Sequence, residues 1–155
     1  MKKRLLLISS IFIILDQLIK IVVRSNIGLN EEIFIIPKFF YLTNLKNTGG
    51  AFSILENNPI MLAIIGVIVI IALYSFIKNK ELSFIEELSY SLLIGGIIGN
   101  IIDRVVLSSV CDYIGLVFGT YYYPVFNLAD IGIVVSIIIL IILELWSDKN
   151  GINSR

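Results

Sequence analysis

The segment 95–104, which reads GGIIGNIIDR, constrains the fold of this chain more than any other. It is apolar enough to lie in a bilayer, yet Asn100, Asp103 and Arg104 stand at i, i+3 and i+4 and would share one face of a helix. A charged side chain near the centre of a bilayer costs about 2.5–3.5 kcal/mol on insertion scales. We therefore expect this polar face to point at protein or water and to mark a functional site.

Composition favours an integral membrane protein. The 155 residues are 57% hydrophobic and 15% charged, against about 45–50% and about 25% in soluble domains. The formal net charge is zero and no basic run alternates with aromatic residues, so nucleic acid is not an expected partner. The chain has no histidine, which excludes a Ser-His-Asp triad and a His-ligated zinc. Any chemistry must therefore fall to carboxylates, hydroxyls, amides or lysines.

Four apolar segments in one domain are long enough to span a membrane: 5–23, 60–77, 85–107 and 124–146, with Pro124 expected at the start of the last helix. The first follows basic residues as a secretory signal does, but it has spanning length and no small-x-small site follows it, so we expect it to be retained. The connecting loops are 24–59 and 108–123. Short β-rich, aromatic runs at 33–36 and 39–42 predict a small sheet at the membrane surface.

The distribution of positive charge predicts the orientation. The basic residues of both chain ends and of the 78–80 turn fall on one side if four spans alternate. Arg24, Lys38 and Lys46 fall on the other side. Because basic loops favour the cytoplasm, we expect both termini inside and both long loops outside.

Three carboxylates from three expected spans lie at similar depths. With about 1.5 Å of rise per residue, Asp16, Asp103 and Asp130 fall roughly 10, roughly 6 and roughly 9 Å from the outer ends of their spans. Asp112 follows the third span closely and is placed to fold back to the same level. Like charges and desolvation both raise a carboxyl pKa, so we expect two of these acids to share one proton.

The residues alone leave the function of such acids open. An acid pair could activate water as aspartic peptidases do, or the acids could relay protons or bind a cation in a small four-span transporter. A purely structural role is disfavoured, since three carboxylates within spans at roughly 3 kcal/mol each is a high cost for packing helices. Two local alternatives also stand: Asp16 is placed to neutralise Lys20 one turn away, and Gly49 and Gly50 could form a simple turn.

Five ordered blocks resemble the motifs of lipoprotein signal peptidase, the bacterial type II signal peptidase: Asp16-Gln17, 47–52 (NTGGAF), 95–104, 110–113 (VCDY) and 126–130 (FNLAD). The match runs over nearly the whole chain. It implies an all-α membrane protein, a four-helix bundle with a small extracytoplasmic β-cradle. It also implies an aspartic peptidase of the bacterial cytoplasmic membrane that cuts diacylglyceryl-modified prolipoproteins just before the lipidated cysteine, with its site near the outer face and without metal or cofactor.

The resemblance also implies roles for single residues. Asp112 and Asp130 match the catalytic pair of the family. Asp103 is the main rival to Asp112, but we expect Arg104 and Asn100 to hold Asp103 ionised, as a structural acid. The positions that match the family's orienting and substrate-holding residues are Asp16, Asn47, Gly49, Asn100, Asp103, Arg104, Asn127 and Ala129.

The chain departs from the family pattern at three places. Gly50 stands where Ala is expected, Ser109 where Gly is expected, and Cys111 where an aliphatic residue is expected. Without a histidine or other evident base nearby, Cys111 is expected to be a small buried apolar residue and not a nucleophile. The expected partners are lipid-modified prolipoproteins and membrane phospholipids, and a monomer is expected. Three aromatic residues are expected to contact lipid or close over substrate: Phe39, Phe40 and Phe52.

Overall fold

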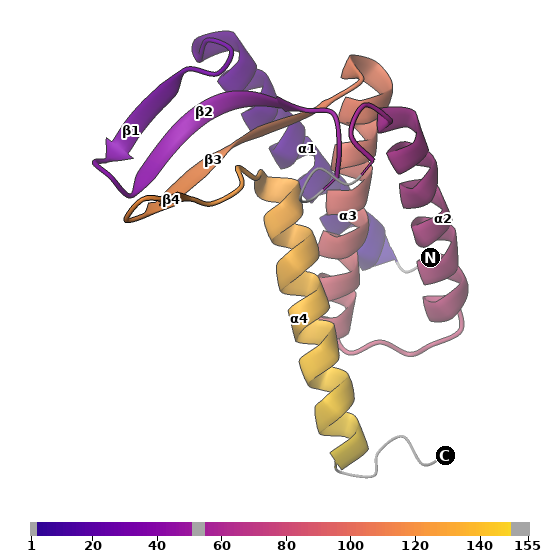
Figure 1. Ribbon diagram of the computed structural model, residues 1–155. Helices are drawn as coiled ribbons and strands as arrows, with labels where there is room; N and C mark the ends of the chain where they lie inside the picture. Colours follow the sequence, from indigo (N-terminus) through magenta and orange to yellow (C-terminus); the bar gives the residue numbers. More distant parts are fainter. Residues whose placement is uncertain (1–2, 51–54, 150–155) are drawn as a thin grey trace.

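The computed structural model describes residues 3–50 and 55–149, which form four helices and one four-stranded antiparallel sheet (Figure 1). The order along the sheet is β1-β2-β3-β4, with α2 and α3 inserted between β2 and β3. The elements are α1 (Lys3–Asn26), β1 (Glu32–Ile36), β2 (Phe40–Asn47), α2 (Pro59–Ile77), α3 (Phe84–Leu107), β3 (Val110–Phe118), β4 (Tyr121–Tyr122) and α4 (Leu128–Lys149). The expected fold class, a four-helix membrane bundle with a small sheet, is confirmed.

Each of the four helices is long and apolar enough to cross a membrane, so the chain is a multi-pass membrane protein. The clearest case is α2, whose 19 residues carry no charge. Their length of about 28 Å, at 1.5 Å of rise per residue, matches a hydrocarbon core of about 30 Å. Within α2 only Ala63 and Ile77 are buried; Leu62, Ile70 and Leu73 are half-buried, and most of the other apolar side chains are exposed, as a lipid environment allows.

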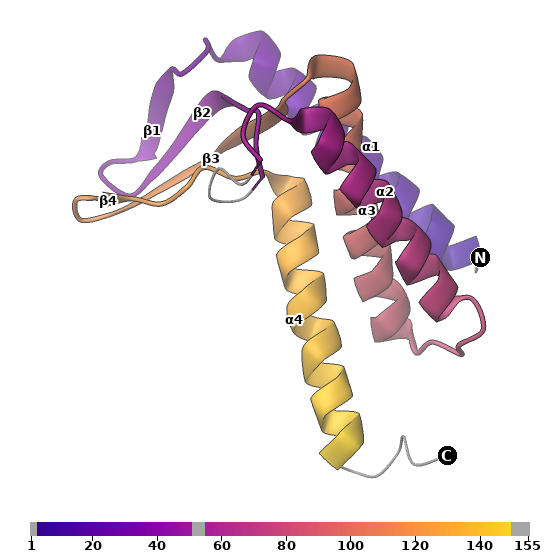
Figure 2. The same ribbon diagram turned by 45° about the vertical axis from the view of Figure 1, so that its right-hand side comes forward.

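The central helix is α3, which packs against the other three (Figures 1 and 2). It begins with a capping box: the Ser83 N–H donates to Glu86 Oε2 at 2.7 Å, and the Glu86 N–H donates to Ser83 Oγ at 3.3 Å. It ends at Leu107 and is capped by Ser108, which has a left-handed backbone (φ 57°) and donates its N–H to the Arg104 carbonyl at 3.1 Å.

Glycines of α3 allow its neighbours to approach closely. A Cβ added at Gly96 would lie 2.6 Å from the carbonyl oxygen of Ala129 in α4, and one at Gly99 would lie 2.6 Å from Asp16 Oδ2 in α1. Gly96 and Gly99 therefore let α4 and α1 pack closely on α3, and at Gly99 the absent side chain makes room for a carboxylate.

The prediction that Pro124 starts the last helix was wrong, since α4 begins at Leu128. Residues before it continue the sheet instead: the Ile114 N–H donates to the Phe126 carbonyl at 2.8 Å, and the Phe126 N–H donates back at 3.1 Å. This pairing holds the segment extended up to Asn127, where the helix is capped. A proline at the first helical position is a local preference that tertiary pairing overrides here.

The sheet lies at the end of the bundle where α1 and α3 end and α4 begins (Figures 1 and 2). The expected strand-like runs correspond to β1 and the start of β2. All five residues of β1 are exposed, and Phe39 is exposed with its ring edge-on to Phe118. The expected role of Phe39 and Phe40 at lipid or substrate stays a prediction, and Phe52 lies outside the described residues.

Candidate active site

A cavity of about 380 Å³ lies where β3, α3 and α4 meet, and both Asp112 and Asp130 line it. One wall is polar and includes the two acids together with Asn47, Asn100 and Arg104. The other wall is apolar and includes Pro124, Phe126, Ile131, Val134 and Val135. The cavity is therefore amphipathic, with the acids at its polar end.

Two amide side chains hold Asp112. Its Oδ1 accepts from Asn127 Nδ2 at 2.6 Å, and its Oδ2 accepts from Asn47 Nδ2 at 2.8 Å. Burial and, to a smaller extent, the negative charge of Asp130 raise the pKa of Asp112 to about 7, while the two amide donors act against the shift. Asp112 can thus hold or release a proton near neutral pH, which a general acid or base must do.

Asp130 lies in the first turn of α4 and is tied to its cap. The Asn127 N–H donates to Asp130 Oδ2 at 3.2 Å, while Asn127 Oδ1 accepts from the Asp130 N–H at 3.0 Å. Asp130 Oδ1 accepts from Asn100 Nδ2 at 2.8 Å. Asn127 therefore contacts both acids, which fixes Asp112 and Asp130 relative to each other.

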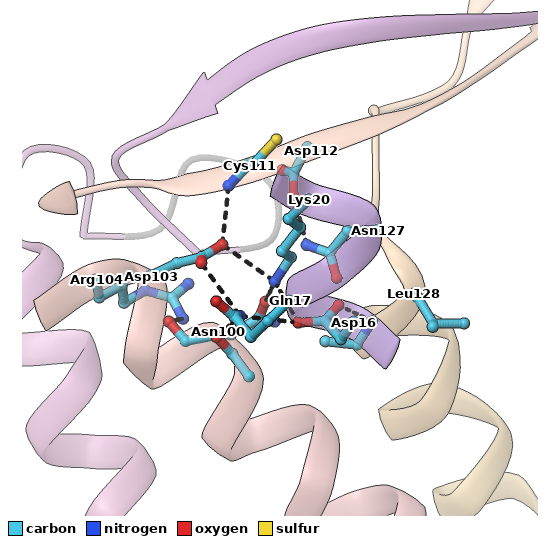
Figure 3. A network of polar contacts seen from close by, with 12 residues as sticks. Asp16, Gln17, Lys20, Asn100, Asp103, Arg104, Cys111, Asp112, Asn127 and Leu128 are labelled. Atoms are coloured by element: carbon cyan, nitrogen blue, oxygen red, sulfur yellow. Dashed lines mark hydrogen bonds and ion pairs between the residues drawn. The ribbon is translucent and has the colours of Figure 1, made fainter. Parts of the chain in front are cut away.

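A fully buried lysine, Lys20, orients the Asn100 side chain (Figure 3). Lys20 Nζ lies 2.8 Å from Asp16 Oδ2 and 3.1 Å from Asp103 Oδ2, and it donates to Asn100 Oδ1 at 3.0 Å. Because an ammonium only donates, it fixes the Asn100 amide with its oxygen toward Lys20 and its nitrogen toward Asp130. Lys20 was not predicted as a site residue; its i, i+4 spacing from Asp16 was the available signal.

Asp16 does not line the cavity but holds the start of α4. Its Oδ1 accepts from the Ala129 N–H at 3.1 Å, and its Oδ2 pairs with Lys20. Both interpretations of Asp16 therefore apply: it neutralises Lys20, and it faces the shared polar site. Ala129 is fully buried at this contact, which explains why a small residue stands there.

The structure corrects the expected partner of Asp103. Among the described residues its ion pairs are with Lys20 and, at 3.7 Å, with Arg24. Arg104 turns away, and its Nη2 donates to the Gly49 carbonyl at 3.1 Å. Consecutive residues point about 100° apart around a helix, so Asp103 and Arg104 diverge on either side of Asn100: Asp103 reaches α1, and Arg104 reaches Gly49.

Residues 47–50, which begin at the last residue of β2, also reach the cavity. Asn47 Oδ1 accepts from the Gly49 N–H at 2.9 Å, which leaves its amide nitrogen free to hold Asp112. Gly50 lines the cavity beside Arg104. The turn interpretation of Gly49 and Gly50 and the functional interpretation are thus compatible, because the turn positions Asn47.

Cys111 precedes Asp112 on β3 and lies in a different environment. It is buried in a cluster with Val23, Ile27 and Tyr113, and burial raises the pKa of its thiol to about 11. A neutral, buried thiol agrees with the expected packing role. Within residues 3–50 and 55–149, no group of three or more His, Cys, Asp or Glu side chains is placed to hold a metal ion.

Comparison with known proteins matches this architecture. A family model described as signal peptidase (SPase) II matches residues 8–146. The chain is 37% identical over 144 residues to a lipoprotein signal peptidase of Listeria monocytogenes serotype 4a, covering 92% of this chain and 94% of the relative. It is 44% identical over 138 residues to that of Streptococcus thermophilus, covering 88% of each.

Solved structures agree with the sequence relatives. One bacterial membrane enzyme superposes with a TM-score of 0.85 at 33% identity, covering 94% of this chain and 90% of that one. A second gives a TM-score of 0.80 at 33% identity, covering 91% of this chain and 92% of that one. The transporter interpretation gains no support from any of these matches. The chain belongs to the signal peptidase II family and is a membrane peptidase.

Proposed function

We propose that this peptidase removes signal peptides from diacylglyceryl-modified prolipoproteins, cutting just before the lipidated cysteine, with Asp112 and Asp130 as its catalytic pair. The relatives in Listeria and Streptococcus carry the name lipoprotein signal peptidase, which supports this substrate class. The observation that carries the assignment is that both carboxylates, from β3 and α4, line one cavity and are held there by amide donors.

The proposed chemistry is that of an acid pair holding one proton. The ionised carboxylate takes a proton from water as the water oxygen attacks the scissile carbonyl carbon. The protonated carboxyl donates its proton to the developing oxyanion. The pKa of about 7 at Asp112 supports this division, because it keeps one proton on the pair near neutral pH.

The apolar wall suits the lipid part of such a substrate. From the acids the cavity continues along α4 past Ile131 to Val134 and Val135. The last two are 55% and 41% exposed and face outward from the bundle. Acyl chains on the cysteine beside the scissile bond could therefore enter from the lipid while the peptide carbonyl reaches the acids.

The remaining site residues divide into two proposed groups. Those that line the cavity without contacting Asp130, or that bond to such a residue, would hold the substrate backbone: Asn47, Gly49 and Arg104. Those that bond to the acids, or to groups that do, would orient the pair: Asp16, Asn100, Asp103, Asn127 and Ala129.

We further propose that the protein acts as a monomer among the phospholipids of the bacterial cytoplasmic membrane, with both termini inside and the active site near the outer face. The charge distribution supports this orientation. Arg4, Lys78 and Lys80 lie at the helix ends away from the sheet, and cytoplasmic ends of membrane proteins are enriched in such residues.

The test is cleavage of a diacylglyceryl-modified prolipoprotein by purified protein in detergent. We expect Asp130→Asn and Asp112→Asn each to lower the cleavage rate by about 10²–10⁴-fold, the usual contribution of general acid–base catalysis. Glu144→Gln, at an exposed acid on the same helix as Asp130, is the matched control and should leave the rate unchanged. A parallel reaction with a chelator should proceed at the full rate.

Two results would contradict the proposal. Full cleavage by Asp112→Asn, with loss of cleavage in a folded Asp103→Asn protein, would move the catalytic role to Asp103. Absence of cleavage by folded wild-type protein, with and without chelator, would remove the substrate assignment.

A further inference from the structure

A second cavity, of about 470 Å³, lies between the end of α1, β2 and the end of α3. Arg24 and Lys46 line it, together with Asn44, Ser109 and Cys111. Ile27, Leu29 and Leu107 give it an apolar side. The peptidase site does not use this cavity, and the two share no lining residue.

One donor beside this cavity lacks a hydrogen-bond partner among the described residues, while the Arg24 side chain as a whole is 28% exposed. Arg24 Nη1 is buried and has no hydrogen-bond partner among the described residues. Its ion pair with Asp103 is long, at 3.7 Å, and Lys20 already lies 3.1 Å from that carboxylate. A guanidinium so placed retains hydrogen-bonding capacity for a further anion, because it offers five N–H donors.

Acids near the cavity do not neutralise its positive charge. The lining within residues 3–50 and 55–149 contains two cations and no carboxylate. Three acids lie close to this lining, and each has other partners or another position: Asp103 is shared with Lys20 at 3.1 Å, Asp112 lines the first cavity, and Glu31 Oε2 accepts from the Gly28 N–H at 2.7 Å. Lys46 is exposed, so its ammonium can turn toward a ligand without breaking a buried contact.

The cavity lies at the level where phospholipid headgroups are expected. Leu107 is the last residue of α3, and Arg24 lies within the last turn of α1, which ends at Asn26. Helix ends mark the boundary between hydrocarbon and headgroups, and basic residues there reach toward the interface. Leu29 and Leu107 are 55% and 43% exposed, so the apolar side of the cavity opens outward.

We propose that this cavity binds the phosphate group of a membrane phospholipid. Arg24 and Lys46 donate to the anionic phosphate oxygens, while the glycerol and the first acyl carbons lie along Ile27, Leu29 and Leu107. Basic pockets between spanning helices bind anionic headgroups on the cytoplasmic side of other membrane proteins, and the same chemistry applies to anionic lipids of the outer leaflet. The inference rests on the membrane-spanning fold and does not depend on the peptidase assignment.

The experiment is native mass spectrometry of the full chain titrated with phosphatidylglycerol in detergent. Near a membrane surface each basic residue contributes about fivefold in affinity for an anionic lipid, so Lys46→Gln should weaken the tightest binding event about fivefold. Arg24→Gln/Lys46→Gln together should weaken it about thirtyfold or more. Lys38→Gln removes the same charge from the turn between β1 and β2, outside the cavity, and is the matched control that should leave binding unchanged.

Competing ligands identify the chemistry and its source. Diacylglycerol with the same acyl chains lacks the phosphate and should not displace phosphatidylglycerol, and neither should inorganic phosphate at millimolar concentration. Displacement by diacylglycerol would show that only acyl chains are bound, and displacement by inorganic phosphate would show a free-anion site. Equal binding by wild type and by folded Lys46→Gln would also overturn the proposal, whatever the stability of the double variant.

Discussion

Lys20 forms two ion pairs, and we predict that the longer of them contributes more to the stability of the helix bundle. Its ammonium lies 2.8 Å from Asp16, one turn away on α1, and 3.1 Å from Asp103 on α3. Distance therefore ranks Asp16 as the stronger partner. Membrane helices, however, separate from each other before they lose helical structure, because their backbone groups must stay internally bonded. The Asp16 pair survives in separated helices, whereas the Asp103 pair is lost.

The size of the effect follows from the geometry. Two unit charges 3.1 Å apart attract by about 5 kcal/mol at an effective dielectric constant of about 20. Desolvation of both groups offsets much of this attraction. Interhelical hydrogen-bond couplings in a membrane protein average about 0.6 kcal/mol and reach about 1.7 kcal/mol. We expect a coupling of about 1–2 kcal/mol for Lys20 with Asp103, and below about 0.5 kcal/mol for Lys20 with Asp16.

Two double-mutant cycles measure these couplings. One combines Lys20→Met with Asp103→Asn, and the other combines Lys20→Met with Asp16→Asn. The free energy of unfolding is obtained for each protein by titration with SDS in mixed micelles, a treatment that separates membrane helices without melting them. Methionine preserves most of the lysine volume, so a cavity does not confound the result. A coupling for Asp16 equal to or larger than that for Asp103 would refute the reasoning.

Three further predictions concern stability. The pKa of Asp112 is raised from 3.8 to about 7 in the folded protein, mainly by burial. Because only the folded state holds that proton between about pH 4 and about pH 7, the free energy of unfolding should fall as the pH rises through this range and level off above it. Asp112→Asn should remove this part of the pH dependence, and a variant with the wild-type pH profile would contradict the prediction. Gly99→Ala places a Cβ 2.6 Å from Asp16 Oδ2 and should destabilise by about 1–3 kcal/mol, more than Gly95→Ala, measured by SDS titration. Ser83→Ala removes the capping box and should cost about 1 kcal/mol in the same assay, with the cleavage rate per folded molecule unchanged.

The spans and the convergence of the acids could be predicted from the sequence because both depend on local rules. An apolar run of about 20 residues dictates a spanning helix in any context. The i, i+3 spacing of Asn100 and Asp103 places them on one face, and the structure brings both into a single network with Asp16 and Asp130. The packing role of the small residues at 95–99 also follows from spacing alone.

The depths of the acids could not be predicted in the same way, because a depth counted along each helix assumes that the outer ends of all spanning helices lie at the same height in the membrane. Asp130 lies in the first turn of α4, about 3 Å from its start, while Asp16 lies about 15 Å before the end of α1. They nevertheless meet, since Asp16 accepts from the Ala129 N–H. The start of α4 is therefore sunk beside the middle of α1, and a tertiary contact, not a sequence pattern, sets that depth.

The partners of the charged residues were equally hidden from sequence. Adjacency favoured Arg104 as the partner of Asp103, but the pairing with Lys20 depends on how α1 and α3 cross. The role of Lys20 in orienting Asn100 can be recognised only in the structure, where the Asn100 amide lies between the Lys20 ammonium and the Asp130 carboxylate. Such relations involve three elements at once, and no single-element periodicity contains them.

The start of α4, deep beside α1, explains why the proposed catalytic pair lies where it does. A helix that begins inside a membrane protein exposes N–H groups that water cannot satisfy. Here side chains satisfy the N–H groups of four consecutive residues: that of Asn127 donates to Asp130, that of Leu128 to the Tyr113 hydroxyl, that of Ala129 to Asp16, and that of Asp130 to Asn127. The positive end of the helix dipole and its donors thus favour a carboxylate at this point. In Asp130→Asn the remaining carbonyl oxygen can still accept from the Asn127 N–H, which should keep α4 in place, but the new amide nitrogen faces Asn100 Nδ2. The folded fraction is therefore measured beside cleavage, and loss of cleavage in folded protein would report on chemistry.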